Sequence, residues 1–296
     1  MVSNSGWFLE AATVAVPHSQ PALHGARVTV LRPSPMRYHH SMRIGIMNNP
    51  ARDVLKEITR AAELGLEFLD LTLEPPVARA DQVDPPRIKA ALARHGLGVI
   101  GHTAYYLPFG SAFDRVQSAA IAEAEACLQV FAEVGAAFMN LHLDSRAPGH
   151  EAAWVKRRNV EAILRLLPAA ERLGVGLMVE NAQGDDADAL APVLDALPTV
   201  GLHLDIGHAN IGTRKSHVPS LLAGYGDRLR HVHVSDNKGR SDDHLVIGAG
   251  TISWKSELRA LKASGYDGMI TLETFYGDSD LTIYSRDKIR QIWESV

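Results

Sequence analysis

Residues 170–181 have the sequence AERLGVGLMVEN, which contains the structural unit that recurs along the chain. An amphipathic run ends at Gly174, a residue type that lets a helix stop in a left-handed conformation. The short apolar run Gly176–Glu180 is typical of a strand buried on both faces. This strand ends in a carboxylate, Glu180, at a place where an unpaired charge is rarely tolerated. The stretch therefore predicts a helix, a buried strand and a polar residue with a chemical role at the strand's end.

The same order recurs from Met42 onward. Helical runs also end in glycine at Gly65, Gly135 and Gly265. Eight short apolar runs are predicted to be strands: Arg43–Met47, Phe68–Leu73, Gly98–Thr103, Phe138–Leu143, Gly176–Glu180, Gly201–Asp205, His231–Ser235 and Met269–Glu273. Helical periodicity predicts helices at Val54–Leu64, Pro86–His95, Arg115–Val134, Val155–Leu173, Val193–Leu197, Trp254–Ser264 and Ile283–Trp293.

Alternating strand and helix units within residues 42–296 predict an α/β protein built as a single (β/α)8 TIM barrel, which typically needs about 250 residues. A doubly wound open sheet is the structural alternative. It would normally carry a glycine-rich phosphate loop after its first strand, where this chain has IMNNPARD (residues 46–53). Residues 1–41 mix Pro, Ser, His and Arg without a sustained period, so we expect a poorly ordered N-terminal extension, with Met42 as an alternative start.

Composition narrows the class of protein. The net charge of −4 does not favour nucleic acid or an anionic membrane as a partner. The single cysteine, Cys127, excludes an intrachain disulfide and fits a reducing, cytoplasmic location. Cys127 lies in an apolar helical run, so we expect a buried structural thiol. No apolar run reaches the roughly 20 residues needed to cross a bilayer, so no membrane partner is expected.

Ionisable residues gather where the predicted third to eighth strands end. In a (β/α)8 barrel these positions converge on one mouth. Burying so many ionisable groups together is costly unless they hold a cation, and mixed imidazole and carboxylate ligands suit a divalent transition metal such as Zn, Mn, Co or Fe. The residues are His102, His142, Glu180, Asp205, His208, His231, His233, Asp242, Asp243, His244 and Glu273.

Two histidines, one of them in the set above, illustrate the alternative, that a His at a strand end is only a satisfied polar group. His203 and His231 each lie two residues before a proposed ligand, Asp205 and His233. Strand alternation therefore places them on the same face one layer deeper, as supporting or core histidines. The joint pattern is stronger evidence than any single residue, because unrelated residues would not repeatedly occupy the same structural position.

These motifs resemble the xylose isomerase-like TIM barrel superfamily, which includes sugar and sugar-phosphate isomerases and epimerases and also endonuclease IV. The resemblance covers the chain from about Met42 to its C-terminus. The stretches that carry it are HTAYYLPFGS (102–111), NLHLDS (140–145), MVENAQG (178–184), GLHLDIGHANIG (201–212), LRHVHVSDNKGRSDDHLVIGAGTISW (229–254) and GYDGMITLETF (265–275).

The epimerase branch of the superfamily implies one metal site with four ligands, Glu180, Asp205, His233 and Glu273. The resemblance further implies that Glu180 and Glu273 are the catalytic acid/base pair. They would move a proton on or off the carbon next to a carbonyl that the metal (Zn, Mn, Co or Mg) polarises. His208 matches a histidine that contacts the substrate or ligates the metal.

The endonuclease IV branch implies a cluster of three zinc ions, so the expected number of ions is one to three per chain. Tyr105 also follows His102 at the family spacing. The alternative function is therefore a zinc-dependent phosphodiesterase acting on abasic DNA. The nine matching ligands are His102, His142, Glu180, Asp205, His208, His233, Asp242, His244 and Glu273.

The sugar-type function is favoured over the nuclease. The loops after the first two predicted strands, NNPARD (48–53) and EPPVARADQVDPP (74–86), are short or rich in Pro and Asp, whereas DNA-binding members use basic and aromatic loops. The charge balance also does not suit a tight DNA binder. The expected partner is a small-molecule sugar or sugar phosphate, with nucleic acid disfavoured. A homo-oligomer is a further expectation, because such barrels often form dimers or tetramers.

Residues expected at the mouth are candidates for substrate contact. Lys238, with Arg240 and Lys215, is a candidate for holding a phosphate or a hydroxyl, with a solvated loop charge as the alternative. Asn181, beside Glu180, is a candidate for contacting a hydroxyl. The predicted substrate-binding residues are His208, Lys238, Glu74 and Tyr105.

Overall fold

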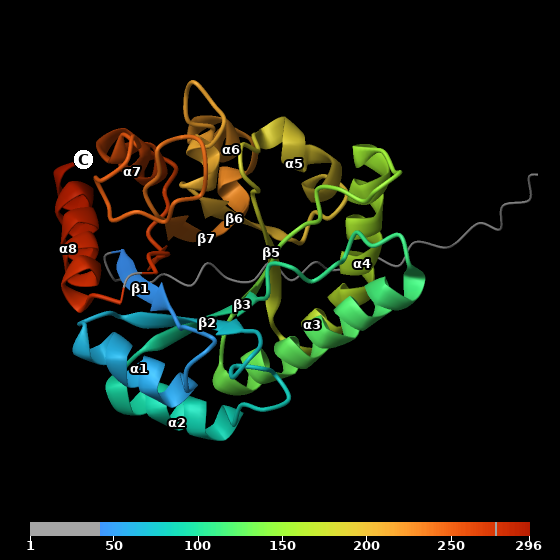
Figure 1. Cartoon of the computed structure of the whole chain (residues 1–296), viewed down its shortest axis with the longest axis horizontal. Helices are drawn as coiled ribbons and strands as arrows, with labels where there is room; N and C mark the ends of the chain where they lie inside the picture. The colour runs from blue at the N-terminus through green and yellow to red at the C-terminus, as the bar shows by residue number, and fades with distance from the viewer. Residues whose placement is uncertain (1–41, 276) are drawn as a thin grey trace, which may run out of the picture. The chain divides into compact units, whose positions relative to one another are not determined.

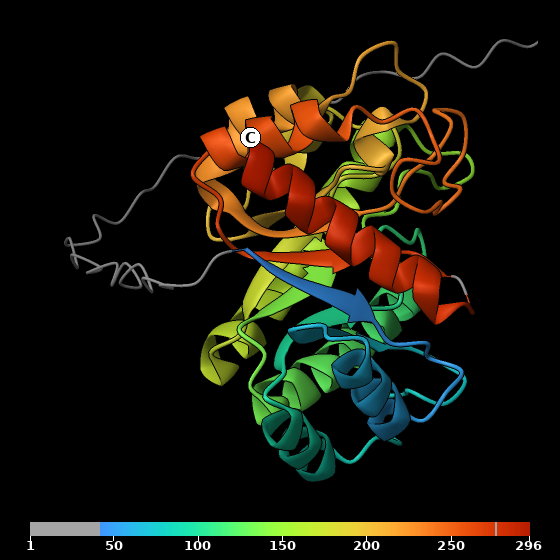
Figure 2. The same ribbon diagram turned by 90° about the vertical axis from the view of Figure 1, so that its left-hand side faces the viewer.

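The structure is a computed structural model that describes residues 42–275 and 277–296, so the extension predicted at residues 1–41 lies outside the described residues. Eight parallel strands close into one barrel, because β1 pairs with β2 on one side and with β8 on the other (Figures 1 and 2). The strands are β1 (Arg43–Met47), β2 (Phe68–Leu73), β3 (Gly98–Thr103), β4 (Phe138–Leu141), β5 (Gly176–Glu180), β6 (Gly201–Asp205), β7 (Leu229–Val234) and β8 (Met269–Leu272). The predicted (β/α)8 barrel is confirmed.

The helices lie outside the strands (Figure 1). They are α1 (Val54–Glu63), α2 (Pro85–His95), α3 (Asp114–Val134), α4 (Ala152–Leu173), α5 (Ala187–Leu194), α6 (Val218–Tyr225), α7 (Trp254–Ala263) and α8 (Ser279–Ser295), with short 3-10 turns η1 (His208–Asn210) and η2 (Gly226–Arg228). The helices α3 and α4 end at Gly135 and Gly174, both with positive φ, as the sequence predicts. Within residues 42–275 and 277–296, no helix is long and apolar enough to cross a membrane.

The fifth and sixth helices differ from the prediction. The helix α5 begins at Ala187 instead of the predicted Val193, after Asp186, whose side chain caps the first turn. Pro192 lies inside this helix. Pro192 is the sixth of the eight residues, and because proline has no N–H, one backbone hydrogen bond of the helix is not made. The helix α6 was not predicted, because its eight residues are too few for a clear helical period.

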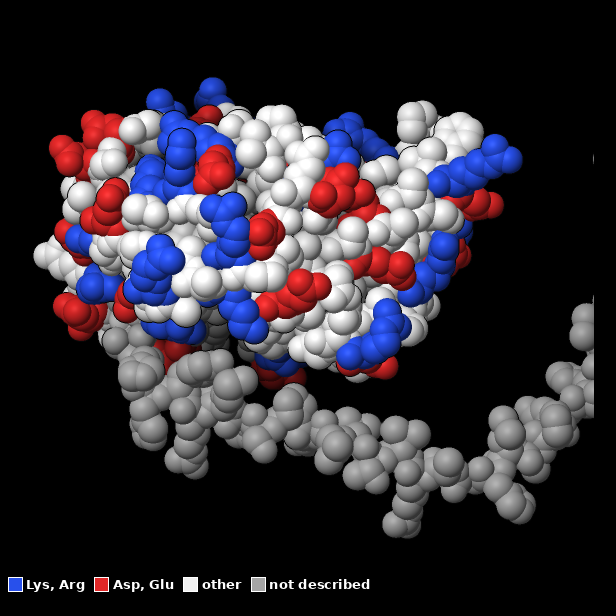
Figure 3. Space-filling model, turned by 90° about the horizontal axis from the view of Figure 1, so that it is seen from below, with Lys and Arg blue, Asp and Glu red and all other residues white. Residues whose placement is uncertain are grey.

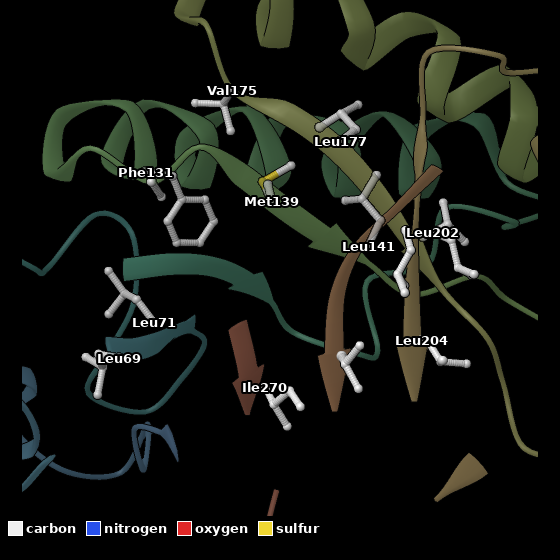
Figure 4. Packing of buried hydrophobic residues seen from close by; sticks show 14 of the residues in the cluster. Leu69, Leu71, Phe131, Met139, Leu141, Val175, Leu177, Leu202, Leu204 and Ile270 are labelled. Carbon is white, nitrogen blue, oxygen red and sulfur yellow. The ribbon is translucent and has the colours of Figure 1, made fainter. Parts of the chain in front are cut away.

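The main core lies between the strands and the helices. Alternate strand residues such as Leu71 in β2, Met139 in β4 and Leu204 in β6 are fully buried. They pack with helix residues such as Phe131 of α3 (Figure 4). Cys127, also in α3, belongs to this core as a free buried thiol, as expected, and burial raises the pKa of the thiol to about 12. We call this set of outward-facing strand residues the outer face of the barrel.

The other strand residues point into the barrel and form its inner face. Phe68, Ile100 and Met178 make a small apolar cluster separate from the main core. The inner face changes from apolar to ionisable within one step along these strands, toward their carboxyl ends, where barrels of this fold place their active sites. The next inward residues on β2, β3 and β5 are Asp70, His102 and Glu180.

Candidate metal centre

A cavity of about 720 Å³ opens at the carboxyl ends of the strands. Asp205 and His233 are fully buried and lie outside its wall, yet both contact residues of the wall. Lys238 is exposed and is not part of the wall. The predicted site residues that line the cavity are Glu74, His102, Tyr105, His142, Glu180, His208, Asp242, His244 and Glu273.

A first group of possible ligands consists of Asp205, His233 and Glu273, whose ligand atoms all lie within 4.8 Å of one another. The strand register places Asp205 beside His233, and His233 Nδ1 lies 3.3 Å from Glu273 Oε2 and 4.0 Å from Asp205 Oδ2. Asp205 Oδ2 is buried without a hydrogen-bond partner. An unsatisfied buried carboxylate oxygen is costly, so a cation fits this position.

A second group of possible ligands consists of His102, His142 and Glu180. Glu180 connects it to the first group, because its carboxylate also lies near Asp205. His142 Nε2 lies 3.0 Å from Glu180 Oε2, and the rings of His102 and His142 stack with centroids 5.0 Å apart. Nδ1 of each histidine is buried and has no hydrogen-bond partner. Asn140 on β4 donates from Nδ2 to Glu180 Oε2 and fixes the carboxylate. Two imidazoles and one carboxylate suit a transition metal.

The third group lies on the loops after β6 and β7. His208 Nε2 and His244 Nε2 lie 3.0 Å and 3.2 Å from Asp242 Oδ2. His208 also reaches Glu180 Oε1 at 3.4 Å, and His244 reaches Glu273 Oε2 at 3.9 Å. His244 has a positive φ of 45°, an uncommon conformation for a residue other than glycine that is frequent at functional sites. The nine predicted ligands therefore form one continuous cluster.

The buried carboxylates respond to this environment in different ways. Burial alone would raise the pKa of Glu180, but neighbouring histidines, above all His142 and His203, hold it well below its usual value. Burial raises the pKa of Asp205 to about 8, because the attraction of His208 only partly offsets it. Without a cation, Asp205 would be largely protonated near neutral pH. A divalent ion would supply the missing positive charge and favour the carboxylate.

Two buried residues of the inner face were not predicted as part of the site. Asp70, in the middle of β2, lies with its Oδ2 2.8 Å from Nε2 of His233 and accepts a hydrogen bond from Thr271 Oγ1 at 2.9 Å. Asn140 holds Glu180. The available signal for Asp70 was a lone carboxylate within the apolar strand FLDLTL, on the same alternating face as the predicted Glu74.

The remaining predictions near the site have different outcomes. His203 and His231 are fully buried and paired in register on β6 and β7, in the deeper layer where they were expected. Asn181 donates from Nδ2 to the carbonyl of Asp205, whose N–H donates back to Asn181 Oδ1 at 2.8 Å. The amide of Asn181 thus positions the end of β6, and because Asn181 also lines the cavity, its contact with a hydroxyl stays a prediction. Asp243 is exposed and bonds to Ser241 and to the backbone of its own loop.

Comparisons with known proteins agree with this architecture. The model of the xylose isomerase-like TIM barrel family matches residues 58–292. A ketose 3-epimerase of Arthrobacter globiformis is 24% identical over 263 residues, which cover 83% of this chain and 85% of that protein. An uncharacterised protein of Methanocaldococcus jannaschii is 32% identical over 123 residues, only 39% of this chain and 42% of that protein. The crystal structure of a D-tagatose 3-epimerase-like protein superposes with a TM-score of 0.76 at 20% identity, over 86% of this chain and 98% of that one.

Proposed function

The chain belongs to the xylose isomerase-like TIM barrel family, and from this premise we propose that it is a divalent-metal-dependent sugar isomerase or epimerase. The similarity to a ketose 3-epimerase over most of both chains supports this class of reaction. The observation that carries the proposal is the placement of two glutamates. Glu180 and Glu273 both line the cavity, whereas Asp205 and His233 lie buried in contact with the same cluster.

Four residues of the cluster would bind the metal, and two of them would also transfer protons. Glu180, Asp205, His233 and Glu273 would hold one ion (Zn, Mn, Co or Mg), which when bound polarises a substrate carbonyl. Glu180 on β5 and Glu273 after β8 approach the cavity from different strands. One takes a proton from the carbon next to the carbonyl, and the other delivers a proton to the same or the adjoining carbon. Burial and the charge of Glu180 both raise the pKa of Glu273, but the contact with His233 outweighs them and holds this pKa below its usual value.

The remaining wall of the cavity suits a polyhydroxy compound better than a phosphate ester. Glu74 and Asp185 are carboxylates outside the proposed ligand set, and partial burial raises the pKa of each. They offer acceptors for sugar hydroxyls. Arg146 is the one Lys or Arg side chain of the described residues in the wall. Tyr105 and Phe275 supply apolar ring faces on which a sugar can stack.

The test is turnover by metal-replete protein. We expect conversion of at least one member of a panel of ketoses and ketose phosphates, detected by NMR of the product, with about one divalent ion per chain by elemental analysis. We also expect Glu180→Gln and Glu273→Gln to slow this turnover by at least about 100-fold. Full activity of either variant on the identified substrate would exclude the mechanism with two glutamates.

A zinc-dependent phosphodiesterase is the second candidate. It is favoured by one observation, the assembly of all nine residues of the three ligand groups around one cavity. Against it, the wall holds five Asp or Glu residues and one arginine, and Lys and Arg are interspersed with Asp and Glu on the face shown in Figure 3. This function predicts two to three zinc ions per chain and cleavage of duplex DNA that contains an abasic site. Failure of zinc-replete protein to cleave that DNA would exclude it.

A further inference from the structure

Asp70 is a buried carboxylate at the centre of the barrel for which the proposed reaction has no direct use. Its side chain is 1% exposed and is not part of the cavity wall, so a substrate in the cavity does not contact it. It nevertheless spans the interior from β2 to residues of β7 and β8. Its Oδ2 atom lies 2.8 Å from His233 Nε2, 2.9 Å from Thr271 Oγ1 and 3.3 Å from His231 Nε2.

The chemistry of these groups sets the direction of each hydrogen bond. An ionised carboxylate only accepts hydrogen bonds, so Nε2 of His233 must carry a hydrogen and donate it. Thr271 donates its hydroxyl hydrogen to Asp70, so its oxygen is free to accept from His231 Nε2, which lies 2.8 Å away. The two histidines are thus held by one carboxylate, His233 directly and His231 through Thr271 as well.

This arrangement has a consequence for the opposite nitrogen of His233. With Nε2 committed to Asp70, Nδ1 of the neutral ring carries the lone pair, and Nδ1 is the atom that faces Glu273 Oε2 at 3.3 Å and Asp205 Oδ2 at 4.0 Å. Metal-binding histidines generally donate their other N–H to a carboxylate or carbonyl, which fixes the tautomer and the ring orientation.

We propose that Asp70 is the positioning residue of the metal centre, holding His233 in the tautomer and orientation that present Nδ1 to a divalent ion. The inference rests on the proposed function in that it requires the ion to bind beside Asp205, His233 and Glu273. Oδ2 of Asp70 already receives the donors of His233 and Thr271, and Oδ1 lies 3.5 Å from His102 Nδ1. Asp70, His102 and His233 could themselves hold an ion, but at the site beside Asp205 and Glu273 the ligand atom is Nδ1 of His233, the ring nitrogen that does not face Asp70. Asp70 acts on the ion at that site through His233.

The experiment compares the affinity for Co²⁺ alone among four forms of the full chain stripped of metal. Asp70→Ala removes the acceptor, and Asp70→Asn keeps the size and one acceptor while removing the charge. Thr271→Val is the matched control, because it alters the same layer but leaves the contact between Asp70 and His233. Calorimetry gives Kd, the visible Co²⁺ absorption bands report ligand geometry, and circular dichroism with thermal melting checks folding.

We expect a Kd about 10- to 100-fold weaker for Asp70→Ala, with shifted Co²⁺ bands, an intermediate value for Asp70→Asn and less than about a threefold change for Thr271→Val. If Asp70→Ala does not fold, the comparison of Asp70→Asn with Thr271→Val decides. Wild-type Kd and bands in the Asp70 variants, even with a lower melting temperature, would assign Asp70 a merely structural role and overturn the inference. Absence of Co²⁺ binding by the wild type would instead overturn the proposed function, and this inference with it.

Discussion

The outer face of the eight strands consists of apolar residues that stabilise the fold, whereas the inner face carries buried ionisable residues at the candidate site. On β6, Leu204 faces outward into the main core, whereas its neighbour Asp205 faces inward into the ligand cluster, and both are fully buried. A buried leucine contributes about 1.5–3 kcal/mol to stability, whereas a buried carboxylate lowers stability unless a partner compensates its charge. Adjacent residues of one strand therefore have different roles: the outward one stabilises the fold and the inward one belongs to the candidate site.

The largest expected effect comes from the two glutamates of the inner face. Glu180→Gln or Glu273→Gln should lower kcat for the identified sugar by about 10²- to 10⁴-fold, because the amide cannot exchange a proton at the reacting carbon. Steady-state kinetics on the folded variants provides the measurement. Glu257→Gln is the matched control, a buried glutamate of α7 away from the cavity wall, and should change kcat by less than about twofold. An equal loss in the control would mean that the effect is not specific to the inner face.

Removal of the metal should affect stability as well as activity. Under the proposed function an ion would bind only the folded arrangement of the inner face, so metal at about 1,000 times its Kd should add about 4 kcal/mol to the free energy of unfolding. Stripping with a chelator should therefore lower the melting temperature by roughly 10 °C and abolish turnover, and adding the ion back should restore both. An unchanged melting temperature in calorimetry, with verified loss of metal, would show that the inner face does not depend on an ion.

Leu204 and Asp205 on β6 test directly whether the two faces have different roles. Leu204→Ala should lower the free energy of unfolding by about 2–5 kcal/mol and leave the metal Kd unchanged, because it removes only outer-face packing. Asp205→Asn should weaken metal binding strongly. In the metal-free protein it should not lower stability near neutral pH, since burial already raises the pKa of the Asp205 carboxyl to about 8. Denaturant titrations and calorimetry measure both quantities, and similar losses in both variants would contradict the division between the two faces.

The smallest effect concerns His244, at the solvent side of the cluster. Burial alone would lower its pKa, but the contact with Asp242 raises it to about 9, above the usual 6.5. In the metal-free protein the resulting stabilisation is complete below pH 6.5 and is lost as the pH rises from 6.5 to 9. After screening, His244→Asn should cost about 1 kcal/mol at pH 6 and less at pH 9. Urea titrations at the two pH values give the difference, and a cost that does not depend on pH would contradict this assignment.

The sequence predicts the outer face well, because its signals are local. Apolar runs and terminal glycines such as Gly135 and Gly174 locate the strands to within two residues. The two helices that were predicted incorrectly, α5 and α6, also have local causes. Pro192 hid the first part of α5, and the short α6 lacks a full apolar period.

The inner face is only partly predictable, because its contacts join residues distant in sequence. Residues at the carboxyl ends of strands, such as Glu180 and Asp205, are predicted because the fold brings strand ends together. Asp70 and Asn140 lie within strands, and their contacts with His233 and Glu180 depend on barrel closure and register. Lys238 was expected at the mouth, but its loop turns it to solvent, a conformation that no local pattern specifies.

The most direct test of the two-glutamate account is solvent exchange at the reacting carbon. Metal-replete protein is incubated with the ketose panel in D₂O, and NMR follows deuterium at the carbons next to the carbonyl. The account predicts deuterium in the product of at least one ketose with the wild type, and none above background with Glu180→Gln or Glu273→Gln. Conversion of a ketose without any deuterium incorporation, or unchanged incorporation in either variant, would contradict proton transfer by the two glutamates.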